Sequence, residues 1–552
     1  MSKLHDIALS RRSLLLAGSA VMAGAATGLT ALPAAAQAAP RTGGTLVYLE
    51  MQAHTNLYPP AGGFYPNSGV LNQITDKLTW QNPKTLEMEP WLAESWEANA
   101  ELTQFTFKLR PGVTFSDGSK LDAKTVARNF DVFGLGDKEK RYPVSEVINN
   151  YDHSEVIDDL TVRFFFKKPS PGFVQGTSVI GSGIVSLGTL ERGFDELGDA
   201  TKIIGTGAFT IASETLGKEV NFAVRKDYNW APKSWAHQGR AYLDAIKMIV
   251  TPEDSVRIGA LISGQADLIR QVQAYDEPQV TAVKGVIYAP STNGVNNGLF
   301  FRPENPLVAD LKVRQALLHA TNTEEVVNTI FSENYPKASS IIAKGAMGYS
   351  DESAKLTFDQ AKAKALLDEA GWKAGAGGLR RKDGKVLELS CYESLAQPQS
   401  RAVLQLIAQQ WAQIGVKLNV LNSDSGTAVV NAMDPARAPL ANSMVGRADL
   451  DVIKSMFYPA NRNMMLQKGG IGKGQDFLDG QMNALLDTLA SETDRTKRFA
   501  AAKAVQAYIL DQAYMIPIFE EPQVFGGAPH VKGLTFDAVA RPSFYDLWLD
   551  KR

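Results

Sequence analysis

The stretch FTFKLRPGVTFSDG at residues 105–118 has the pattern of a strand followed by two turns. Alternate residues at its start are apolar, namely Phe105, Phe107 and Leu109. Alternation of period two predicts a strand with one buried face, and the Pro-Gly and Asp-Gly pairs that follow predict turns. Apolar alternation returns at residues 162–166 and 220–224, and a helix is expected from about Asp122. These patterns predict a β-rich region whose phenylalanines form a core rather than a ligand platform.

Outward from this region, the second half of the chain alternates helical and strand patterns. Capping boxes, in which Ser or Thr precedes Glu or Gln by three residues, predict helix starts at Thr321 and Thr357. Two glycines that favour the ends of helices follow predicted helices: Gly371 and Gly415. Strands are expected at residues 416–420 and 513–519. Helix, glycine and strand in this order are typical of α/β construction.

The composition excludes several classes of protein. With 552 residues, of which 44% are apolar and 21% charged, the chain is expected to fold around more than one core. A net charge of −2 gives no basic face for nucleic acid. The single cysteine, Cys391, excludes an intramolecular disulfide and any site built from several cysteines. No two of the six histidines are three or four residues apart, so no local metal-binding pair is expected.

The first 38 residues have the pattern of an export signal. Twin arginines in SRRSLLL at residues 10–16 precede an Ala- and Gly-rich apolar stretch, which is typical of a twin-arginine signal. Small residues predict cleavage after Ala36 or Ala38. A membrane anchor is the alternative, since the stretch approaches the length of a membrane span. We expect removal of residues 1–38 and a soluble protein in the periplasm.

No enzyme motif stands out. The sequence contains no P-loop, no G-x-S-x-G and no H-E-x-x-H. The GTG at residues 205–207 lacks the third glycine of a dinucleotide fingerprint. We therefore expect a binding protein rather than an enzyme, with an exported hydrolase as the weaker alternative.

Several stretches, in this order along the chain, carry a resemblance to a known family. They are PWLAESW at 90–96, the quoted stretch at 105–118, LDAKTV at 121–126, GTGAF at 205–209, VRQAL at 313–317, AKALLDEAGW at 363–372, GVKLN at 415–419 and IPIF at 516–519. Together they resemble the family 5 extracellular solute-binding proteins, the peptide, nickel and opine group of ABC importers. The resemblance covers nearly the whole chain after the export signal.

This resemblance implies an α/β fold, that of a two-lobed type II periplasmic binding protein with a hinge between the lobes and an extra β-rich subdomain in the first lobe. The implied boundaries are 1–38 for the signal peptide, 39–75 for the first part of lobe 1, 76–197 for the inserted subdomain, 198–289 for the rest of lobe 1, 290–512 for lobe 2 and 513–552 for the return to lobe 1.

The resemblance also implies a function. The protein would capture a peptide, or a peptide-like or amino-acid-derived solute, by hinge closure and deliver it to an inner-membrane ABC permease. A nickel chelate, an opine or haem are alternative solutes on the same fold. The twin-arginine translocase is the partner implied during export. A monomer is expected, with no cofactor, no metal site of its own and no nucleic acid partner.

The candidate ligand contacts follow from the family's pocket, which lies between the lobes. They are Asp449 for a ligand amino group, Arg447 for a carboxylate, Glu393, Asn296, Asn297, Tyr58 and Ser182. Asp449 has the alternative role of a helix N-cap, and Arg447 that of a solvated surface charge. Where dipeptide-binding members carry an arginine for the peptide carboxylate, this chain has Glu393 and no basic residue in the turn at 391–399. That departure argues against simple dipeptide specificity and favours a cationic group near Glu393.

Overall fold

The computed structural model describes residues 39–394, 397–422, 431, 434–458 and 479–550. The predicted export signal at residues 1–38 lies outside the described residues. Among the helices described, none is both long and apolar enough to cross a membrane.

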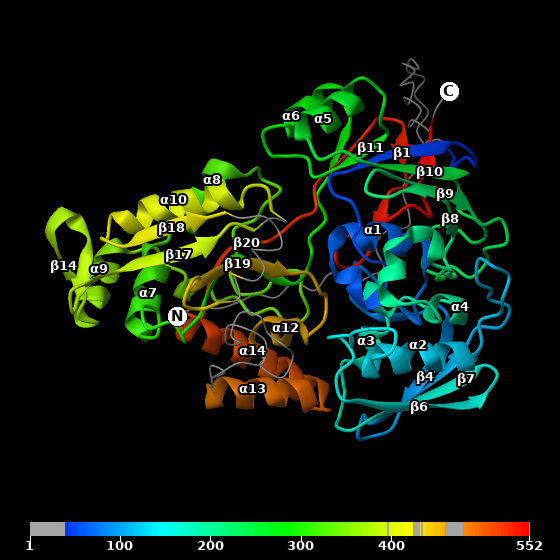
Figure 1. Cartoon of the computed structure of the whole chain (residues 1–552), viewed down its shortest axis with the longest axis horizontal. Coiled ribbons are helices and arrows are strands. Elements are labelled where there is room, and N and C mark those ends of the chain that lie inside the picture. Colours follow the sequence, from blue (N-terminus) through cyan, green and yellow to red (C-terminus); the bar gives the residue numbers. More distant parts are fainter. Residues whose placement is uncertain (1–38, 395–396, 423–430, 432–433, 459–478, 551–552) are drawn as a thin grey trace, which may run out of the picture. The chain divides into compact units, whose positions relative to one another are not determined.

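A seven-stranded sheet organises the first lobe (Figure 1), and its strand order is β12-β21-β11-β1-β10-β9-β8. The strands are β1 Thr45–Glu50, β8 Phe209–Thr215, β9 Glu219–Val224, β10 Ala245–Val250, β11 Leu268–Arg270, β12 Val286–Tyr288 and β21 Phe525–Gly527. Strand β1 runs parallel to both neighbours, β10 and β11, whereas β21 from the C-terminal segment pairs antiparallel with β11 and β12. Helices α1 Tyr65–Ile74, α5 Asp254–Ile262 and α6 Glu277–Ala282 pack against this sheet.

The β-rich region predicted from the quoted stretch is a four-stranded antiparallel sheet in the order β4-β5-β7-β6. Its strands are β4 Ala93–Ala98, β5 Gln104–Leu109, β6 Tyr151–Asp158 and β7 Thr161–Phe166. The predicted alternation is confirmed, because the three apolar residues of β5 are buried. Phe105 and Phe107 contact phenylalanines of β7, and Phe130 of α2 Ala123–Leu135 packs on Phe164 of the same strand. The Asp122 side chain caps α2 by accepting a 2.7 Å hydrogen bond from the Thr125 amide.

Short elements join this region to the seven-stranded sheet. They are the strands β2 Thr79–Gln81 and β3 Met88–Pro90, the helices α3 Phe173–Gly176 and α4 Leu187–Leu190, and the 3₁₀ turns Pro59–Gly63, Ile180–Ser182, Phe194–Gly198 and Ala200–Lys202. The turns Pro59–Gly63 and Ile180–Ser182 pack against each other.

A five-stranded sheet in the order β18-β17-β19-β13-β20 forms the second lobe. Its strands are β13 Val295–Phe301, β17 Glu388–Tyr392, β18 Lys417–Leu421, β19 Leu440–Val445 and β20 Met515–Phe519. Helices flank it on both sides (Figure 1): α7 Leu311–Ala320, α8 Thr323–Ile330, α9 Gln360–Glu369, α10 Ser400–Ala412, α12 Val452–Phe457, α13 Gly480–Ser491 and α14 Arg495–Asp511. A small three-stranded sheet is attached, with β14 Lys373–Ala374, β15 Arg380–Lys382 and β16 Lys385–Val386, and a 3₁₀ turn at Ser353–Lys355 precedes α9.

The predicted helix ends are confirmed, but the two predicted capping boxes are wrong. Gly371 and Gly415 follow α9 and α10 with φ values of +84° and +82°. The residues that cap α8 and α9 are Asn322 and Asp359, whose side chains accept the amides of Glu325 and Lys362. Short carboxylate and amide side chains cap as well as or better than threonine. The Thr321 hydroxyl instead bonds the Leu317 carbonyl and the Trp411 indole.

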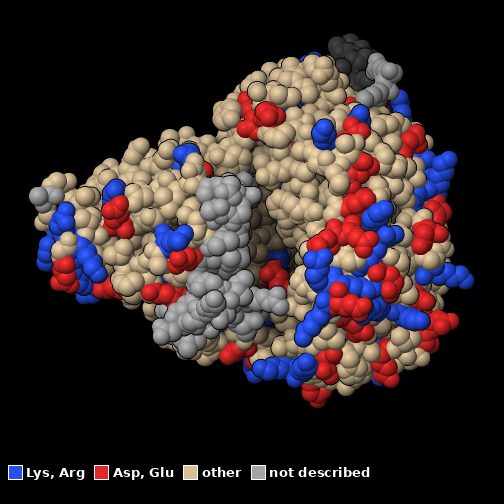
Figure 2. Space-filling view, in the orientation of Figure 1, with Lys and Arg blue, Asp and Glu red and all other residues tan. Residues whose placement is uncertain are grey.

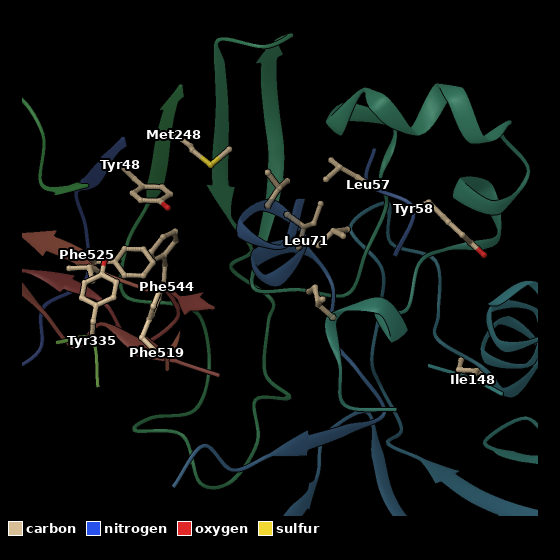
Figure 3. Packing of buried hydrophobic residues seen from close by; sticks show 14 of the residues in the cluster. Tyr48, Leu57, Tyr58, Leu71, Ile148, Met248, Tyr335, Phe519, Phe525 and Phe544 are labelled. Carbon is tan, nitrogen blue, oxygen red and sulfur yellow. The ribbon is translucent and has the colours of Figure 1, made fainter. Parts of the chain in front are cut away.

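The C-terminal segment returns to the first lobe and forms two small antiparallel pairs. One pair joins β22 Val531–Lys532 to β25 Trp548–Leu549, and the other joins β23 Thr535–Phe536 to β24 Pro542–Ser543. Figure 3 shows buried residues of this segment beside the first strand. The rings of Tyr48 and Phe544 meet edge to face with centroids 5.4 Å apart. The return of the chain thus completes the core of lobe 1.

Candidate functional site

Two adjoining cavities lie where the first lobe, the second lobe and the C-terminal hairpin meet. Their volumes are about 280 and 240 Å³. Figure 2 shows a hollow between the two lobes. Five residues line both cavities and so connect them: Gly63, Met444, Gly446, Val539 and Arg541. A ligand that filled this space would contact both lobes at once.

Five structural elements supply most of the walls. From lobe 1 come the Pro59–Gly63 turn, the start of α1 and the Ile180–Ser182 turn; from lobe 2 come the end of β19 and the residues after it, 443–448. The fifth is the β23–β24 hairpin of the C-terminal segment. Gly294 lets β13 approach β19 here, because a Cβ at Gly294 would lie 1.7 Å from the Val445 carbonyl oxygen.

The second cavity has a buried ion pair in its wall. Arg270 donates from Nε to both carboxylate oxygens of Glu50, over 2.8 and 2.9 Å, and both side chains are almost fully buried. The Tyr48 hydroxyl donates to the same carboxylate over 2.7 Å. The Arg270 guanidinium also lies 4.3 Å from the ring centroid of Tyr65. The charge of Arg270 is therefore neutralised within the wall.

The first cavity is bordered by a second paired arginine. Arg447 donates from Nε and Nη2 to both oxygens of Asp449, and its Nη1 donates to the Ser455 hydroxyl over 3.0 Å. Arg447 lines the cavity, whereas Asp449 lies behind it and is 3% exposed. Glu146 and Asp537 add two further carboxylates to the lining.

A buried acid, Glu521, lines the second cavity just after β20. Burial raises the pKa of Glu521 to about 7, although hydrogen bonds from Gln397 and Asn297 partly oppose the shift. The Asn297 amide lies 3.4 Å from Glu521 Oε2, and Gln397 donates to the same oxygen. This carboxyl therefore changes charge near neutral pH inside the site.

The β23–β24 hairpin is held in place from three sides. The Asp537 amide donates to the Arg541 carbonyl over 2.9 Å, and the Asp537 carboxylate accepts the amides of Val539 and Arg541. Asn72 and Gln73 of α1 both donate to the Pro542 carbonyl, over 3.0 and 2.9 Å. The Asn293 amide donates to the Ala538 carbonyl over 2.8 Å. These bonds fix the position of Arg541.

Two of the residues predicted from sequence lie at the cavities. Arg447 lines the first cavity, and Asn297 contacts Glu521 and Gln397 of the second. Asp449 is held by Arg447 and is not the cap of the next helix, since α12 begins after Asp451. The alternative of a solvated Arg447 is also wrong, because the Arg447 guanidinium is buried and paired with Asp449.

The other predicted residues have partners elsewhere. The Tyr58 ring stacks on Tyr142 with centroids 4.6 Å apart, and the Ser182 hydroxyl donates to the Gly176 carbonyl over 2.6 Å. The Asn296 amide donates to the Ser340 carbonyl over 2.9 Å. Arg401 makes two hydrogen bonds to Glu393, over 2.9 and 3.0 Å. None of the four lines either cavity among the described residues, and their role as ligand contacts stays a prediction.

The family of the chain follows from a match that covers most of this architecture. The model of the bacterial extracellular solute-binding proteins, family 5 Middle, matches residues 87–457, which is well over half of the chain. The chain belongs to this family. Within the described residues, no group of three or more His, Cys, Asp or Glu side chains is placed to hold a metal ion.

Similar proteins extend the match to both lobes of this solute-binding protein. The dipeptide-binding protein of Escherichia coli (strain K12) is 24% identical over 534 residues, which span 92% of this chain and 95% of that protein. The structure of DppA from Helicobacter pylori in complex with peptide STSA superposes with a TM-score of 0.76 at 22% identity, over 93% of this chain and 99% of DppA. NikA from Brucella suis in complex with Fe(III)-EDTA gives 0.75 at 23% identity, over 92% and 100%. The fold is that of a two-lobed, type II periplasmic binding protein.

Sequence reasoning missed the hairpin, Glu521 and the Glu50–Arg270 pair. The Glu520-Glu521 doublet directly after a predicted buried strand was an available signal, since an acid that close to a core is seldom buried unless it has a partner. The hairpin gave no such signal. Its lining residues stand in the unremarkable stretch DAVAR at 537–541.

Proposed function

We propose that this protein is the substrate-binding component of an ABC importer and that it captures a peptide, or a peptide-like or amino-acid-derived solute. The solute enters between the lobes, the hinge closes, and the closed form delivers it to an inner-membrane permease without making or breaking a bond. Export by the twin-arginine route into the periplasm and a monomeric state belong to the same proposal. Family membership and the peptide ligands named for the relatives support it.

The observation that carries the proposal is the mixed lining of the connected cavities. Carboxylates of Glu146 and Asp537 and guanidinium groups of Arg447 and Arg541 border one space. A zwitterion with an ammonium and a carboxylate group matches such a lining, because each end meets the opposite charge. The combined volume falls within the range of about 300–1,000 Å³ that is usual for small-molecule sites.

Closure requires a ligand that binds the closed arrangement better than the open one. The lobes already touch through direct contacts: Gln81 donates from Nε2 to the Ala448 carbonyl over 2.9 Å. Arg495 of lobe 2 also lies 3.3 Å from Glu87 of lobe 1. A solute held by residues of both lobes adds to these contacts only when the lobes are together. It therefore shifts the population toward the closed state.

The first test is a thermal-shift and calorimetry screen of protein that has been unfolded and refolded to remove carried-over ligand. The panel holds di- to pentapeptides, opines, cationic amino-acid derivatives, haem, and nickel with and without histidine. A ligand at 100 times its Kd is expected to add about 2.7 kcal/mol to the free energy of unfolding. Binding of a peptide or amino-acid derivative supports the proposal. No binding from the panel, together with no small molecule in native mass spectra of the untreated protein, contradicts it.

A variant that fills the site separates binding at this cleft from binding elsewhere. A Cβ at Gly63 would meet no described residue within 4 Å, and Gly63 lines both cavities, so Gly63→Phe is expected to block them without straining the backbone. Gly259 on α5 has the same open surroundings away from the cavities, and Gly259→Phe is the matched control. Loss of ligand binding is expected in the first variant alone. Equal affinity in both would place the binding site elsewhere.

A further inference from the structure

The three guanidinium groups of the described residues that border the two cavities differ in whether a carboxylate pairs with them. Arg270 and Arg447 are each held by a buried carboxylate, as described above. Arg541 lines both cavities and has no ion-pair partner among the residues that the structure describes. Burying an ionised group without a partner is costly, and native proteins seldom tolerate it without a function.

Arg541 is buried as deeply as the two paired arginines. Its residue is 7% exposed, and its Nε is a buried donor that has no hydrogen-bond partner among the described residues. The cavity walls therefore hold a planar donor group with unused hydrogen-bonding capacity. A guanidinium offers two parallel N–H donors at the spacing of the two oxygens of a carboxylate, so a bound carboxylate would satisfy it.

Charges of both signs lie near Arg541, but no carboxylate of the described residues forms an ion pair with it. Lys77 is 2% exposed, and burial lowers the pKa of Lys77 to about 8; Asp537 and Asp76 oppose this shift, and repulsion by Arg541 adds to it. Its ammonium group donates to Asn72 over 2.7 Å rather than to a carboxylate. Asp537 is the acid on the same hairpin, and one of its carboxylate oxygens is engaged by two backbone amides.

Hydrogen bonds to the hairpin also hold the backbone of Arg541 in place without a ligand. The bonds from Asn72, Gln73 and Asn293 hold residues 538–542 against α1 and the start of β13. The Tyr65 hydroxyl donates to the Ala540 carbonyl, next to Arg541 in sequence. A receptor on an ordered backbone loses less entropy when it binds than one on a free chain.

We propose that Arg541 is the receptor for a carboxylate group of the solute. The inference rests on the proposed function, since it names the group by which the captured solute is held. The turn at 391–399 carries Glu393 and no basic residue, so it offers no contact for an anion. In this proposal the C-terminal hairpin supplies that contact. The solute carries a free carboxylate, which lies at the junction of the two cavities and pairs with Arg541 when the lobes are together.

The first experiment compares the free-acid and C-terminal amide forms of the peptides that bind in the screen, by isothermal titration. Against wild type, amidation is expected to weaken binding at least tenfold, since hydrogen bonds between charged groups are among the stronger ones. In Arg541→Gln the acid and the amide are expected to bind equally weakly. Arg541→Lys keeps the positive charge but loses the two parallel N–H donors, and it is expected to retain part of the preference for the free acid over the amide. A wild type that binds acid and amide equally, or an Arg541→Gln variant that keeps the full preference, overturns the inference while leaving the proposed function intact.

The second experiment needs no peptide. Acetate at constant ionic strength, with acetamide as the neutral comparison, is expected to raise the melting temperature of wild type but not of Arg541→Gln. Arg141→Gln removes an exposed guanidinium paired with Asp195 and is the matched control, which should respond to acetate as wild type does. An equal acetate response in wild type and Arg541→Gln overturns the inference. If acetate acts through Arg541 but no solute of the panel binds, the anion site stands and the proposed function fails.

The unligated stability of the same variant distinguishes a receptor from a structural arginine. Arg541→Gln removes an unpaired buried charge, so its melting temperature without ligand is expected to equal or exceed that of wild type. A large fall in both Arg541→Gln and Arg541→Lys would show that the guanidinium holds the fold together, and the receptor role would be rejected.

Discussion

Arg447 and Asp449, two residues apart after the end of β19, form a bidentate ion pair. Arg447 Nη2 lies 3.0 Å from Asp449 Oδ1 and 2.8 Å from Oδ2, and Nε lies 3.0 Å from Oδ2. The pair is buried at the edge of the first cavity. A ligand amine that bound Asp449 would have to share a carboxylate that Arg447 already occupies.

Removing one member of this pair is expected to destabilise the fold strongly. Asp449→Ala leaves the Arg447 guanidinium buried beside an alanine, and breaking a buried pair in this way costs about 3–5 kcal/mol. The double variant Arg447→Met, Asp449→Leu removes both charges and is expected to recover most of that loss. Urea unfolding of the three proteins checks the prediction. A single variant as stable as wild type would mean that the pair adds nothing to the fold.

Glu521 is expected to make the stability of the protein depend on pH between about 4.5 and 7. Its folded pKa of about 7 lies above its ordinary value of 4.5, so the folded state keeps a proton that the unfolded chain releases. The free energy of unfolding therefore falls as pH rises through this window, by about 3 kcal/mol at most. Above pH 7 the loss is complete and constant; below 4.5 it is absent.

The variant Glu521→Gln is expected to remove this slope. It should match wild type near pH 4.5 and be more stable by up to about 3 kcal/mol at pH 8. Urea unfolding at several pH values measures the difference. Glu324→Gln changes a carboxylate whose side chain is 69% exposed, and serves as the control whose slope should follow wild type. The same slope in wild type and Glu521→Gln would refute the prediction.

Local sequence patterns predicted the elements of the fold. In a strand or helix with one buried face, apolar residues recur at a fixed spacing, which is visible within a short stretch of sequence. The alternation in β5 and the start of α2 near Asp122 needed no knowledge of the rest of the chain. The predicted caps of α8 and α9 were one and two residues too early, since Asn322 and Asp359 compete with the threonines for the start of each helix. Such competition is decided by backbone geometry, which a pattern of residue types does not contain.

The candidate site was less predictable, because its residues meet through tertiary contacts. Glu50 and Arg270 are 220 positions apart and pair only because β1 and β11 are neighbours in the sheet. What distinguishes Arg541 is that no described residue forms an ion pair with it, and a missing partner has no signature in sequence. Arg447 was found because the resemblance marked its segment, but its pairing with Asp449 was not foreseen.

The single cysteine is expected to be chemically inert in the folded protein. Cys391 is fully buried on β17, and burial raises the pKa of its thiol to about 12. Because the thiolate is the reactive form, native protein should resist iodoacetamide at pH 8, whereas protein in denaturing guanidinium chloride should be alkylated to completion. Mass spectrometry after timed labelling measures both rates. Fast labelling of the native protein would contradict this burial.

The GTG at residues 205–207 is expected to be a packing motif, and substituting its last glycine should be costly. A Cβ at Gly207 would lie 2.4 Å from the carbonyl carbon of Ile74 and 2.6 Å from the Gln73 oxygen, at the end of α1. These are backbone atoms, so α1 itself would have to move, and Gly207→Ala is expected to cost about 2–3 kcal/mol or more. At Gly259 in α5 an added methyl meets no atom of the described residues within 4 Å, and Gly259→Ala is expected to stabilise by about 0.5–1 kcal/mol.

Chemical denaturation of these two alanine variants, measured side by side, checks the expected loss of stability in Gly207→Ala and the expected gain in Gly259→Ala. The comparison is sharp because the substitution is chemically the same and only the surroundings differ. A Gly207→Ala variant as stable as wild type would show that α1 can move away from residues 205–207 at little cost. Since α1 also holds the Pro542 carbonyl through Asn72 and Gln73, such a shift would move the hairpin that carries Arg541. Gly207→Ala is therefore expected to weaken solute binding as well as the fold, whereas Gly259→Ala leaves the affinity unchanged.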